Sequence, residues 1–258
     1  MRNISVSLNN GSFVHSLAQA RVATETTKSV DGMLWYVPHS LLGLYQDSLK
    51  QQEVTAVGQP VGYVTDWSRE FNLSYYELPS DRPLLGSMLI DGLNCPYLNF
   101  NNKHLFTEQN LYVDGFLNDI ALCYSGTIEN NSAVVLGNVD SISYNRFYIG
   151  SSATGTIQVG ASNVEYDTGI AWGTTPKVVS VLKNSSTLVI RVDAQEVQRI
   201  SLPLTVRPNI TYSPQSFRQT LSNPANAKLF MQFMAFNPTT IDQLSEIENL
   251  GMMLTAKL

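Results

Sequence analysis

The closing part of the chain has the clearest pattern of apolar and polar positions. Residues 229–236 (LFMQFMAF) are apolar at nearly every position, which is typical of a strand buried on both faces. Asn237-Pro238 ends this run, because proline donates no ladder hydrogen bond and restricts the residue before it. The sequence therefore predicts one buried strand and then a break.

A short amphipathic helix is predicted directly after this break. Thr240 and Gln243 have the spacing of a capping box, in which each side chain bonds the backbone of the other residue. One helical face is then apolar, and the other is expected to face solvent. The apolar positions are Ile241, Leu244, Ile247 and Leu250, and the solvent-facing ones are Asp242, Gln243, Glu246 and Glu248.

Short apolar or alternating runs separated by Gly, Asn and Ser fill most of the remaining chain. Strands are expected at residues 32–36, 97–100, 120–124, 133–136, 147–149, 156–159, 178–182 and 187–192. Residues 111–117 form a further apolar run, which Asp114-Gly115 interrupts with a hairpin signal. No helical pattern of about 10–15 residues separates them, which disfavours a parallel α/β fold. The pattern predicts an all-β antiparallel sandwich or barrel. Residues 1–30 are expected to form an N-terminal arm or peripheral strand, and residues 31–258 one domain.

Composition narrows the classes of partner. Charged residues make up 14% of the chain, against about 25% in an average globular protein, so uncharged polar residues must cover the surface. A surface of this kind suits permanent contact with other subunits. The net charge of −5 and the absence of a run of Lys or Arg argue against nucleic acid as the main partner, so we expect none.

The two cysteines, Cys95 and Cys123, have no CxxC motif and no nearby histidine, so they do not indicate a metal site. They could form one disulfide, although cysteine statistics favour two buried free thiols. Residues 1–29 lack an apolar segment before a cleavage site, which predicts no signal peptide. No stretch approaches the ~20 apolar residues of a membrane span, so we expect no membrane insertion.

Three stretches resemble a known family. They are Leu34-Trp35-Tyr36-Val37-Pro38 with residues 42–68 (LGLYQDSLKQQEVTAVGQPVGYVTDWS), residues 188–197 (LVIRVDAQEV), and the closing strand and capped helix. Together they are similar to the concanavalin A-like, laminin-G-type jelly-roll proteins of tailed bacteriophages and prophages. The resemblance covers roughly residues 33–254 and implies two packed antiparallel sheets with a short C-terminal helix. Asp193-Ala194 departs from the usual Asp/Asn-Gly turn of that family, since alanine tolerates positive φ poorly.

The resemblance also implies a function. The leading hypothesis is a non-enzymatic virion structural protein, such as a capsid decoration, head-fibre or tail-associated subunit. Other virion proteins would be its partners, it would form homo-oligomers, and it would be located in the virion, with adhesion to a cell-surface glycan as a further role. The alternative hypothesis is a lectin-like module that recognises a cell-surface polysaccharide, and the third hypothesis is a glycoside hydrolase.

Catalysis has weak support in the sequence. His15, His39 and His104 lie in no nucleophile-base context, and GxSxG, HExxH and EF-hand motifs are absent. Glucanases with a related sandwich use an E-x-D-x-x-E strand, and Glu165-Tyr166-Asp167 supplies its first half. Ile170 stands in place of the last glutamate, so we interpret E-x-D as a chance occurrence on a polar turn.

Metal binding has equally weak support. The aspartates with some potential as calcium ligands are not grouped at ligand spacing; they are Asp114, Asp119, Asp140 and Asp167. Aspartates in hairpin turns normally accept hydrogen bonds from their own backbone. We therefore expect no metal, no cofactor and no catalytic residue.

Sugar binding without catalysis needs an aromatic ring for stacking and polar groups that fix hydroxyls. Tyr166 and Asp167 near Trp172, and Tyr76 beside Trp67, supply these residue types. Trp172 lies close to Gly169 and Gly173 and is the best candidate for an exposed ring, with packing in the core as the equal alternative. These five residues form the candidate glycan site.

Overall fold

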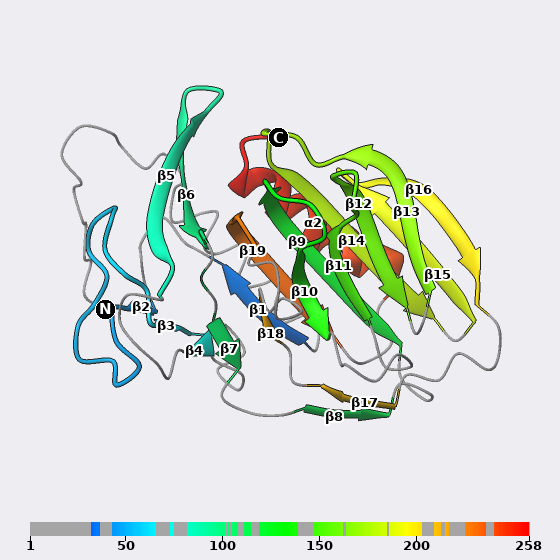
Figure 1. Ribbon diagram of the computed structural model, residues 1–258, viewed down its shortest axis with the longest axis horizontal. Helices are drawn as coiled ribbons and strands as arrows, with labels where there is room; N and C mark the ends of the chain where they lie inside the picture. The colour runs from blue at the N-terminus through cyan, green and yellow to red at the C-terminus, as the bar shows by residue number, and fades with distance from the viewer. Residues whose placement is uncertain are drawn as a thin grey trace.

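Two antiparallel sheets packed face to face, with one helix behind the larger sheet, form the body of the computed structural model (Figure 1). The all-β sandwich with a short C-terminal helix is thus confirmed. The structure describes residues 32–36, 43–65, 73–74, 82–101, 103, 105–107, 111–114, 119–138, 147–161, 164–184, 186–202, 209–212, 215–216, 225–235 and 240–257. The expected N-terminal arm at residues 1–30 lies outside these residues.

The larger sheet has eight strands and places the closing strand in its middle. Its order is β16 (Gln195–Ser201), β15 (Thr187–Val192), β14 (Lys177–Asn184), β9 (Ile120–Ile128), β19 (Ala227–Ala235), β6 (Leu93–Asn99) and β5 (Leu84–Ile90), with β1 (Gly32–Tyr36) beside β19. One edge of β19 pairs with β9, while the other pairs first with β6 and then with β1. Nearly every residue of β19 is buried, as its apolar run predicted.

The smaller sheet has four strands in the order β10 (Val134–Asn138), β11 (Phe147–Ser151), β12 (Thr156–Ala161) and β13 (Val164–Ala171). Consecutive strands pair as antiparallel neighbours, so this sheet is a simple meander. It lies in front of β9 and β14 in Figure 1. The sequence predicted the first three strands and missed β13, which was interpreted as a polar turn.

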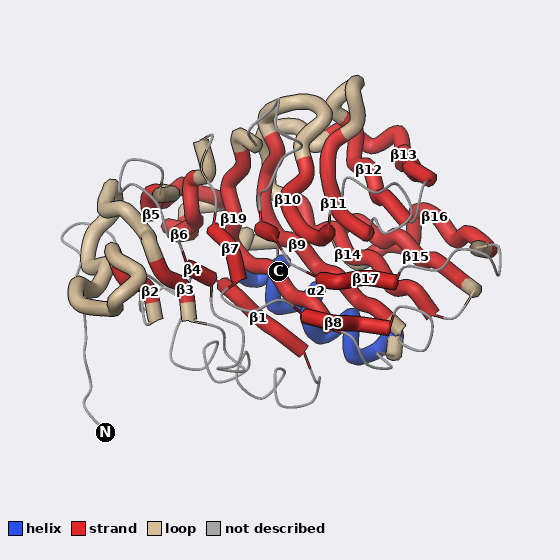
Figure 2. Tube along the Cα trace, turned by 60° about the horizontal axis from the view of Figure 1, so that its bottom comes forward, coloured by secondary structure: helices blue, strands red, loops and turns tan. Residues whose placement is uncertain are grey.

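Two further small sheets lie beside the sandwich. One pairs β17 (Asn209–Tyr212) with β8 (Leu111–Asp114). The other has the order β18 (Gln215–Ser216), β7 (Leu105–Thr107), β4 (Leu73–Ser74), β3 (Tyr63–Val64) and β2 (Leu44–Tyr45). Figure 2 shows β8 and β17 running along one side of the sandwich.

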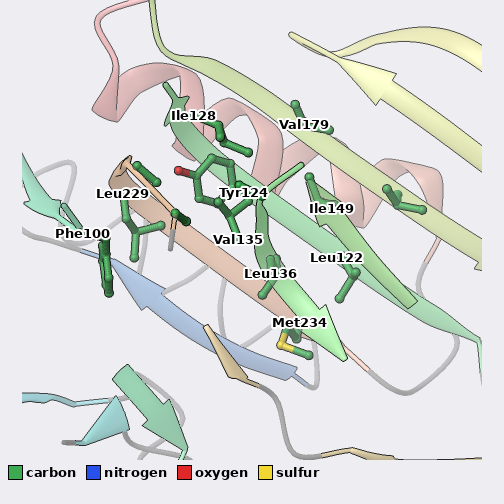
Figure 3. Close-up of a cluster of buried hydrophobic side chains, with 14 of the residues drawn as sticks. Phe100, Leu122, Tyr124, Ile128, Val135, Leu136, Ile149, Val179, Leu229 and Met234 are labelled. Carbon is green, nitrogen blue, oxygen red and sulfur yellow. The ribbon is translucent and has the colours of Figure 1, made fainter. Parts of the chain in front are cut away.

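The main core fills the space between the larger and the smaller sheet (Figure 3). Leu122 and Tyr124 of β9 and Val179 of β14 face Val135 and Ile149 of the smaller sheet. Alternate residues of each strand enter this layer, as expected for a pleated strand with one face on a core. The larger sheet is therefore buried on this face.

The opposite face of the larger sheet is covered by α2 (Ile241–Leu254), which contacts β14, β9 and β19. Leu244, Ile247 and Leu250 pack on a second apolar layer that includes Cys123 and Phe233. The predicted capping box is present: the Thr240 hydroxyl accepts the backbone N–H of Gln243, and the Gln243 side chain accepts the backbone N–H of Thr240. The central strands β14, β9 and β19 are thus buried on both faces, which requires nearly continuous apolar sequences in them.

Glu248 was expected to face solvent, and this prediction is wrong. Its side chain is fully buried beneath α2, where its carboxylate bonds the Arg191 guanidinium through Nε at 2.8 Å and Nη2 at 3.0 Å. The Ser180 hydroxyl also donates to it. Arg191 and Ser180 are cross-strand neighbours on the outer face of the sheet, which explains why both reach one helical residue.

The hairpin between β15 and β16 turns through Asp193 and Ala194, as the sequence predicted. Both residues have positive φ, at 49° and 62°, as a two-residue type I′ turn requires. The Asp193 carboxylate accepts the Val178 N–H at 2.9 Å and lies 2.6 Å from Lys257 Nζ. The Ala194 carbonyl accepts a hydrogen bond from Arg191 at 2.6 Å. Polar contacts around the turn therefore hold alanine in a conformation that it normally avoids.

Candidate functional site

The best-supported polar site lies on the outer face of the smaller sheet, away from the core. β13 places Glu165 and Asp167 on this face, because side chains two residues apart on a strand point the same way. Across the sheet, Glu165 lies opposite Gly160 of β12, which lies opposite Tyr148 of β11. The E-x-D pattern is therefore on an edge strand of the sheet and not on a turn.

Tyr148, Gln158 and Glu165 form a hydrogen-bonded group on this face. The Tyr148 hydroxyl donates to Glu165 Oε1 at 2.8 Å, and Gln158 Nε2 donates to Glu165 Oε2 at 3.2 Å. Tyr148 Oη also lies 3.5 Å from Gln158 Oε1. Both carboxylate oxygens of Glu165 are thus held by neighbouring strands, and its position on the surface is fixed.

Glycine at position 160 makes room for this group. A Cβ atom on Gly160 would lie 2.1 Å from Cε1 of the Tyr148 ring, so no larger residue fits there while the ring keeps its place. The Tyr148 ring packs over Gly160 and is itself buried, so the hydroxyl is the part of this side chain that bonds other polar groups. Tyrosine over a cross-strand glycine therefore aims the hydroxyl toward Glu165.

Asp167 belongs to a second polar group at the turn between β11 and β12. The Thr156 hydroxyl, the backbone N–H of Gly169 at 2.8 Å and the Ser152 hydroxyl bond its carboxylate and lower its pKa, with Thr156 as the largest cause. Ser152 and Thr156 are themselves 2.5 Å apart between hydroxyl oxygens. Asp167 is consequently an ionised acceptor at neutral pH, set among hydroxyl groups.

The edge of this face is tied to the larger sheet. Gln198 of β16 donates from Nε2 to the Asp167 carbonyl oxygen at 3.0 Å. β13 is the last strand of its sheet and β16 the last strand of the other, so this bond joins the two sheets at one side of the sandwich. The surface that bears Glu165 and Asp167 is thus anchored on a rigid scaffold.

Trp172 was the best candidate for an exposed, sugar-stacking ring, and the structure corrects this. Its side chain is 1% exposed, and its indole N–H donates to the Gly150 carbonyl at 3.0 Å. Its ring packs edge-on against Tyr124 of β9, with centroids 5.7 Å apart. The ring lies in the main core, packed on Tyr124, and offers no face to a ligand.

The other predicted site residues separate into two groups. Tyr166 is half-buried and packs against the core from β13, so only Asp167 of that pair lies on the polar face. Trp67 and Tyr76 lie outside the described residues. The sequence analysis missed Tyr148 and Gln158. The only signal for them was that Tyr148 and Gly160 lie on adjacent strands. That relationship requires the strand register, which the sequence does not display.

The described residues give little support to metal or hydrolytic chemistry. No group of three or more His, Cys, Asp or Glu that could hold a metal ion occurs among them. Ile170, which replaces the third carboxylate of a glucanase strand, packs partly buried against the core. Asp167 has a lowered pKa, whereas the general acid of a glycosidase needs a raised one. Cys95 and Cys123 are both free and buried, which confirms the preferred interpretation of the two thiols.

No helix in the described part of the chain is long and apolar enough to cross a bilayer.

Comparison with known proteins supports the fold. No protein-family model and no curated protein match the chain. A GH54 α-L-arabinofuranosidase soaked with a cyclic sulfate inhibitor is similar in structure, with a TM-score of 0.57, 11% identity, and coverage of 77% of this chain and 52% of that one. The Trypanosoma rangeli sialidase has a TM-score of 0.51 and 9% identity over 92% of this chain and 39% of its own.

A toxin domain is similar to the same degree. The binding domain of Paraclostridial Mosquitocidal Protein 1 has a TM-score of 0.50 and 10% identity, with 78% of this chain and 51% of that domain covered. The chain thus spans about half or less of the length of these solved structures. At such identities the likeness establishes an antiparallel β-sandwich of jelly-roll type.

Proposed function

We propose that this chain is a carbohydrate-binding β-sandwich that acts without turnover, and that its ligand binds the outer face of the smaller sheet. The observation that carries the proposal is the group of Tyr148, Gln158 and Glu165, fixed in place by Gly160. Glycan hydroxyls are recognised by pre-positioned carboxylate and amide groups of this kind. The arabinofuranosidase and sialidase likeness is compatible with this class of ligand, although it concerns the fold alone.

The charge of the face indicates the class of glycan. Two carboxylates, Glu165 and Asp167, are exposed on it, and the chain has a net charge of −5. Sialylated or uronic-acid-rich polysaccharides would be repelled, whereas neutral sugars with adjacent hydroxyls can donate to the carboxylates. We therefore propose a neutral polysaccharide as the ligand.

Hydrolysis is the less favoured reading of the same two carboxylates. The lowered pKa of Asp167 makes this side chain a poor proton donor, and both oxygens of Glu165 accept hydrogen bonds from Tyr148 and Gln158. Incubation with neutral polysaccharides, followed by a reducing-end assay, tests this directly. Release of reducing ends that is lost in Glu165→Gln would replace the binding proposal with a hydrolase.

The binding proposal is tested on a glycan array and by affinity electrophoresis in neutral polysaccharides. Glu165→Ala and Gln158→Ala should each weaken retention at least about tenfold, since each removes a polar anchor worth roughly 1.5 kcal/mol. Glu53→Ala is the matched control. Glu53 is an exposed carboxylate beside β2 in the five-stranded sheet, so its loss should not change retention. Absence of binding to every neutral glycan, or equal loss in the control, would overturn the proposal.

The second candidate function concerns the assembly in which such a module acts. We propose a virion structural role, as a capsid decoration, head-fibre or tail-associated subunit, for which the sequence stretches at residues 33–68 and 188–197 are the supporting observation. The low charged fraction of 14% also suits permanent subunit contacts. Mass spectrometry of purified particles from a lysogen that encodes the chain would detect stoichiometric copies. Deletion of residues 1–30 should abolish incorporation if those residues anchor the subunit.

A further inference from the structure

The hairpin of β5 and β6 extends beyond the rest of the larger sheet (Figure 1). Its base is held in the fold by Leu85 and Leu98, which are buried in the main core. Only Lys228 and Leu229 of β19 pair with β6, opposite Asn99 and Leu98. The distal half, up to the Asp91-Gly92 turn, therefore has hairpin pairing and no further strand beside it among the described residues.

The two edges of this distal half differ. On β6, the backbone N–H of Phe100 bonds the Ala227 carbonyl at 2.9 Å, which shows that even-numbered residues point away from β5. Pro96 occupies this outward register, where it has no N–H to offer. The β6 edge is thus blocked against further pairing by its own sequence.

The β5 edge has no such protection. Leu85 bonds outward through both backbone groups, to Gly58 at 2.7 Å and to Gln59 at 2.9 Å, so Ser87 and Leu89 also point outward. Neither Ser87 nor Leu89 has an outward backbone hydrogen bond in the described part of the chain. The strand LLGSMLI contains no charge and no proline, and the Leu89 side chain is 68% exposed. Exposed edges are normally protected by lysine, proline or a bulge.

We propose that the β5 edge pairs with the β5 edge of a second copy of this chain, across a two-fold axis at Met88. The axis places Ser87 of one copy opposite Leu89 of the other. Each facing pair exchanges two backbone hydrogen bonds, so the two pairs form four in total. The backbone N–H and C=O groups of Ser87 and Leu89 in each copy are then all hydrogen-bonded. This is the self-complementarity that a two-fold interface requires.

Charge favours the same occupant. The net charge of −5 opposes most self-contacts, but residues 84–90 of both copies are uncharged. In the proposed register, pairing between the copies ends before Leu85, whose outward groups bond Gly58 and Gln59 of its own chain, and the two Asp91 carboxylates are at opposite ends of the paired strands. Leu89 of each copy would pack beside the second β5, which removes the most exposed apolar side chain of the hairpin from water.

The oligomeric state tests the proposal by sedimentation velocity over a range of concentrations. The wild-type chain should form a reversible dimer. Leu89→Lys and Ser87→Pro should each raise the dimer dissociation constant about tenfold to a hundredfold, because Ser87→Pro removes two of the four interchain bonds and Leu89→Lys places like charges in the interface. Leu49→Lys is the matched control, since Leu49 is 74% exposed on a distant loop and should leave the dimer intact.

The register is tested by a cysteine at the two-fold axis. Met88 lies opposite Cys95 within one chain, so Met88→Cys is made together with Cys95→Ala. Non-hydrogen-bonded residues of an antiparallel pair have Cα atoms about 4.5 Å apart, which permits a disulfide between copies. Oxidation should give a covalent dimer, whereas Leu49→Cys in the same background should not. A wild-type monomer, or a dimer that survives Leu89→Lys and Ser87→Pro, would overturn the proposal.

Discussion

Arg191 on β15 and Glu248 on α2 form a two-point ion pair that fixes the helix to the outer face of the larger sheet. The bonds are 2.8 and 3.0 Å long, and Glu248 is fully buried. Arg191 also reaches the Ala194 carbonyl, so one side chain links the helix, the strand and the hairpin turn. The helix is consequently positioned by a polar contact as well as by its apolar face.

Loss of one partner of this pair should destabilise the fold strongly. Glu248→Ala leaves the guanidinium of Arg191, which is 13% exposed, without its carboxylate, and we expect the free energy of unfolding to fall by about 3 kcal/mol. Arg191→Met with Glu248→Leu should recover most of this loss, because neither charge then remains buried. Urea unfolding followed by circular dichroism measures both. Asn249→Ala, at an exposed position of the same turn, should change stability by less than about 0.5 kcal/mol, and a similarly small effect of Glu248→Ala would contradict the prediction.

Ala194→Gly should stabilise the protein. Ala194 has φ of 62°, a region in which a Cβ atom costs roughly 1–2 kcal/mol and glycine costs none. After the extra entropy of glycine in the unfolded chain, a net gain of about 0.5–1 kcal/mol is expected. Ala171→Gly is the control, because Ala171 lies on a strand without positive φ and should lose stability instead. A loss of stability in Ala194→Gly as well would show that the turn is not strained.

Gly160→Ala should destabilise the smaller sheet through one side chain. The new Cβ would lie 2.1 Å from Cε1 of Tyr148, and overpacking of this kind costs about 1–3 kcal/mol. In a Tyr148→Ala background the clash is gone, so the same Gly160→Ala change should be neutral or slightly stabilising. Thermal unfolding of the wild-type chain, the two single variants and the double variant gives this double-mutant cycle, and equal costs of Gly160→Ala in both backgrounds would rule out the contact.

The two thiols should be unreactive in the folded protein and should lower its stability at alkaline pH. Burial, and then the Asp91 carboxylate, raise the pKa of Cys95 from 9.0 to about 11. Burial, and then the Glu248 carboxylate, raise the pKa of Cys123 well above its ordinary value. The unfolded thiols ionise first, so the contribution to stability is complete below pH 9 and is lost as the pH rises toward 11.

A thiol-specific reagent at pH 8 checks this expectation. It should label neither cysteine in buffer and both cysteines in urea. Cys95→Ala should make the loss of stability between pH 9 and 11 less steep than in the wild-type chain. Rapid labelling of either thiol in buffer would contradict the expected burial.

The sequence predicted those features that depend on neighbouring residues along the chain. Alternating or continuous apolar runs located β15 and β19, and the capping box at Thr240 and Gln243 located the start of α2. Each of these signals is local, since it needs only the period of the element and the chemistry of its ends.

Features that depend on strand register were missed or misjudged. Tyr148 lies over Gly160 only because β11 and β12 pair in one particular register. Glu248 looks like a solvent-facing residue on a helical wheel, and only the position of Arg191 across the sheet explains its burial. Trp172 is flanked by residues typical of loops, and the residues that it contacts in the core, Tyr124 and Gly150, are remote in sequence.

The central place of β19 has a consequence for how the protein is made. Residues 227–235 separate β9, β14, β15 and β16 on one side from β1, β5 and β6 on the other. During synthesis on the ribosome, the two halves of this sheet have nothing to join them until that segment has emerged. The apolar faces of β5 and β6 therefore stay without their neighbouring strand while the chain from β7 to β19 is made, and a chaperone that shields nascent strands would raise the yield of folded protein.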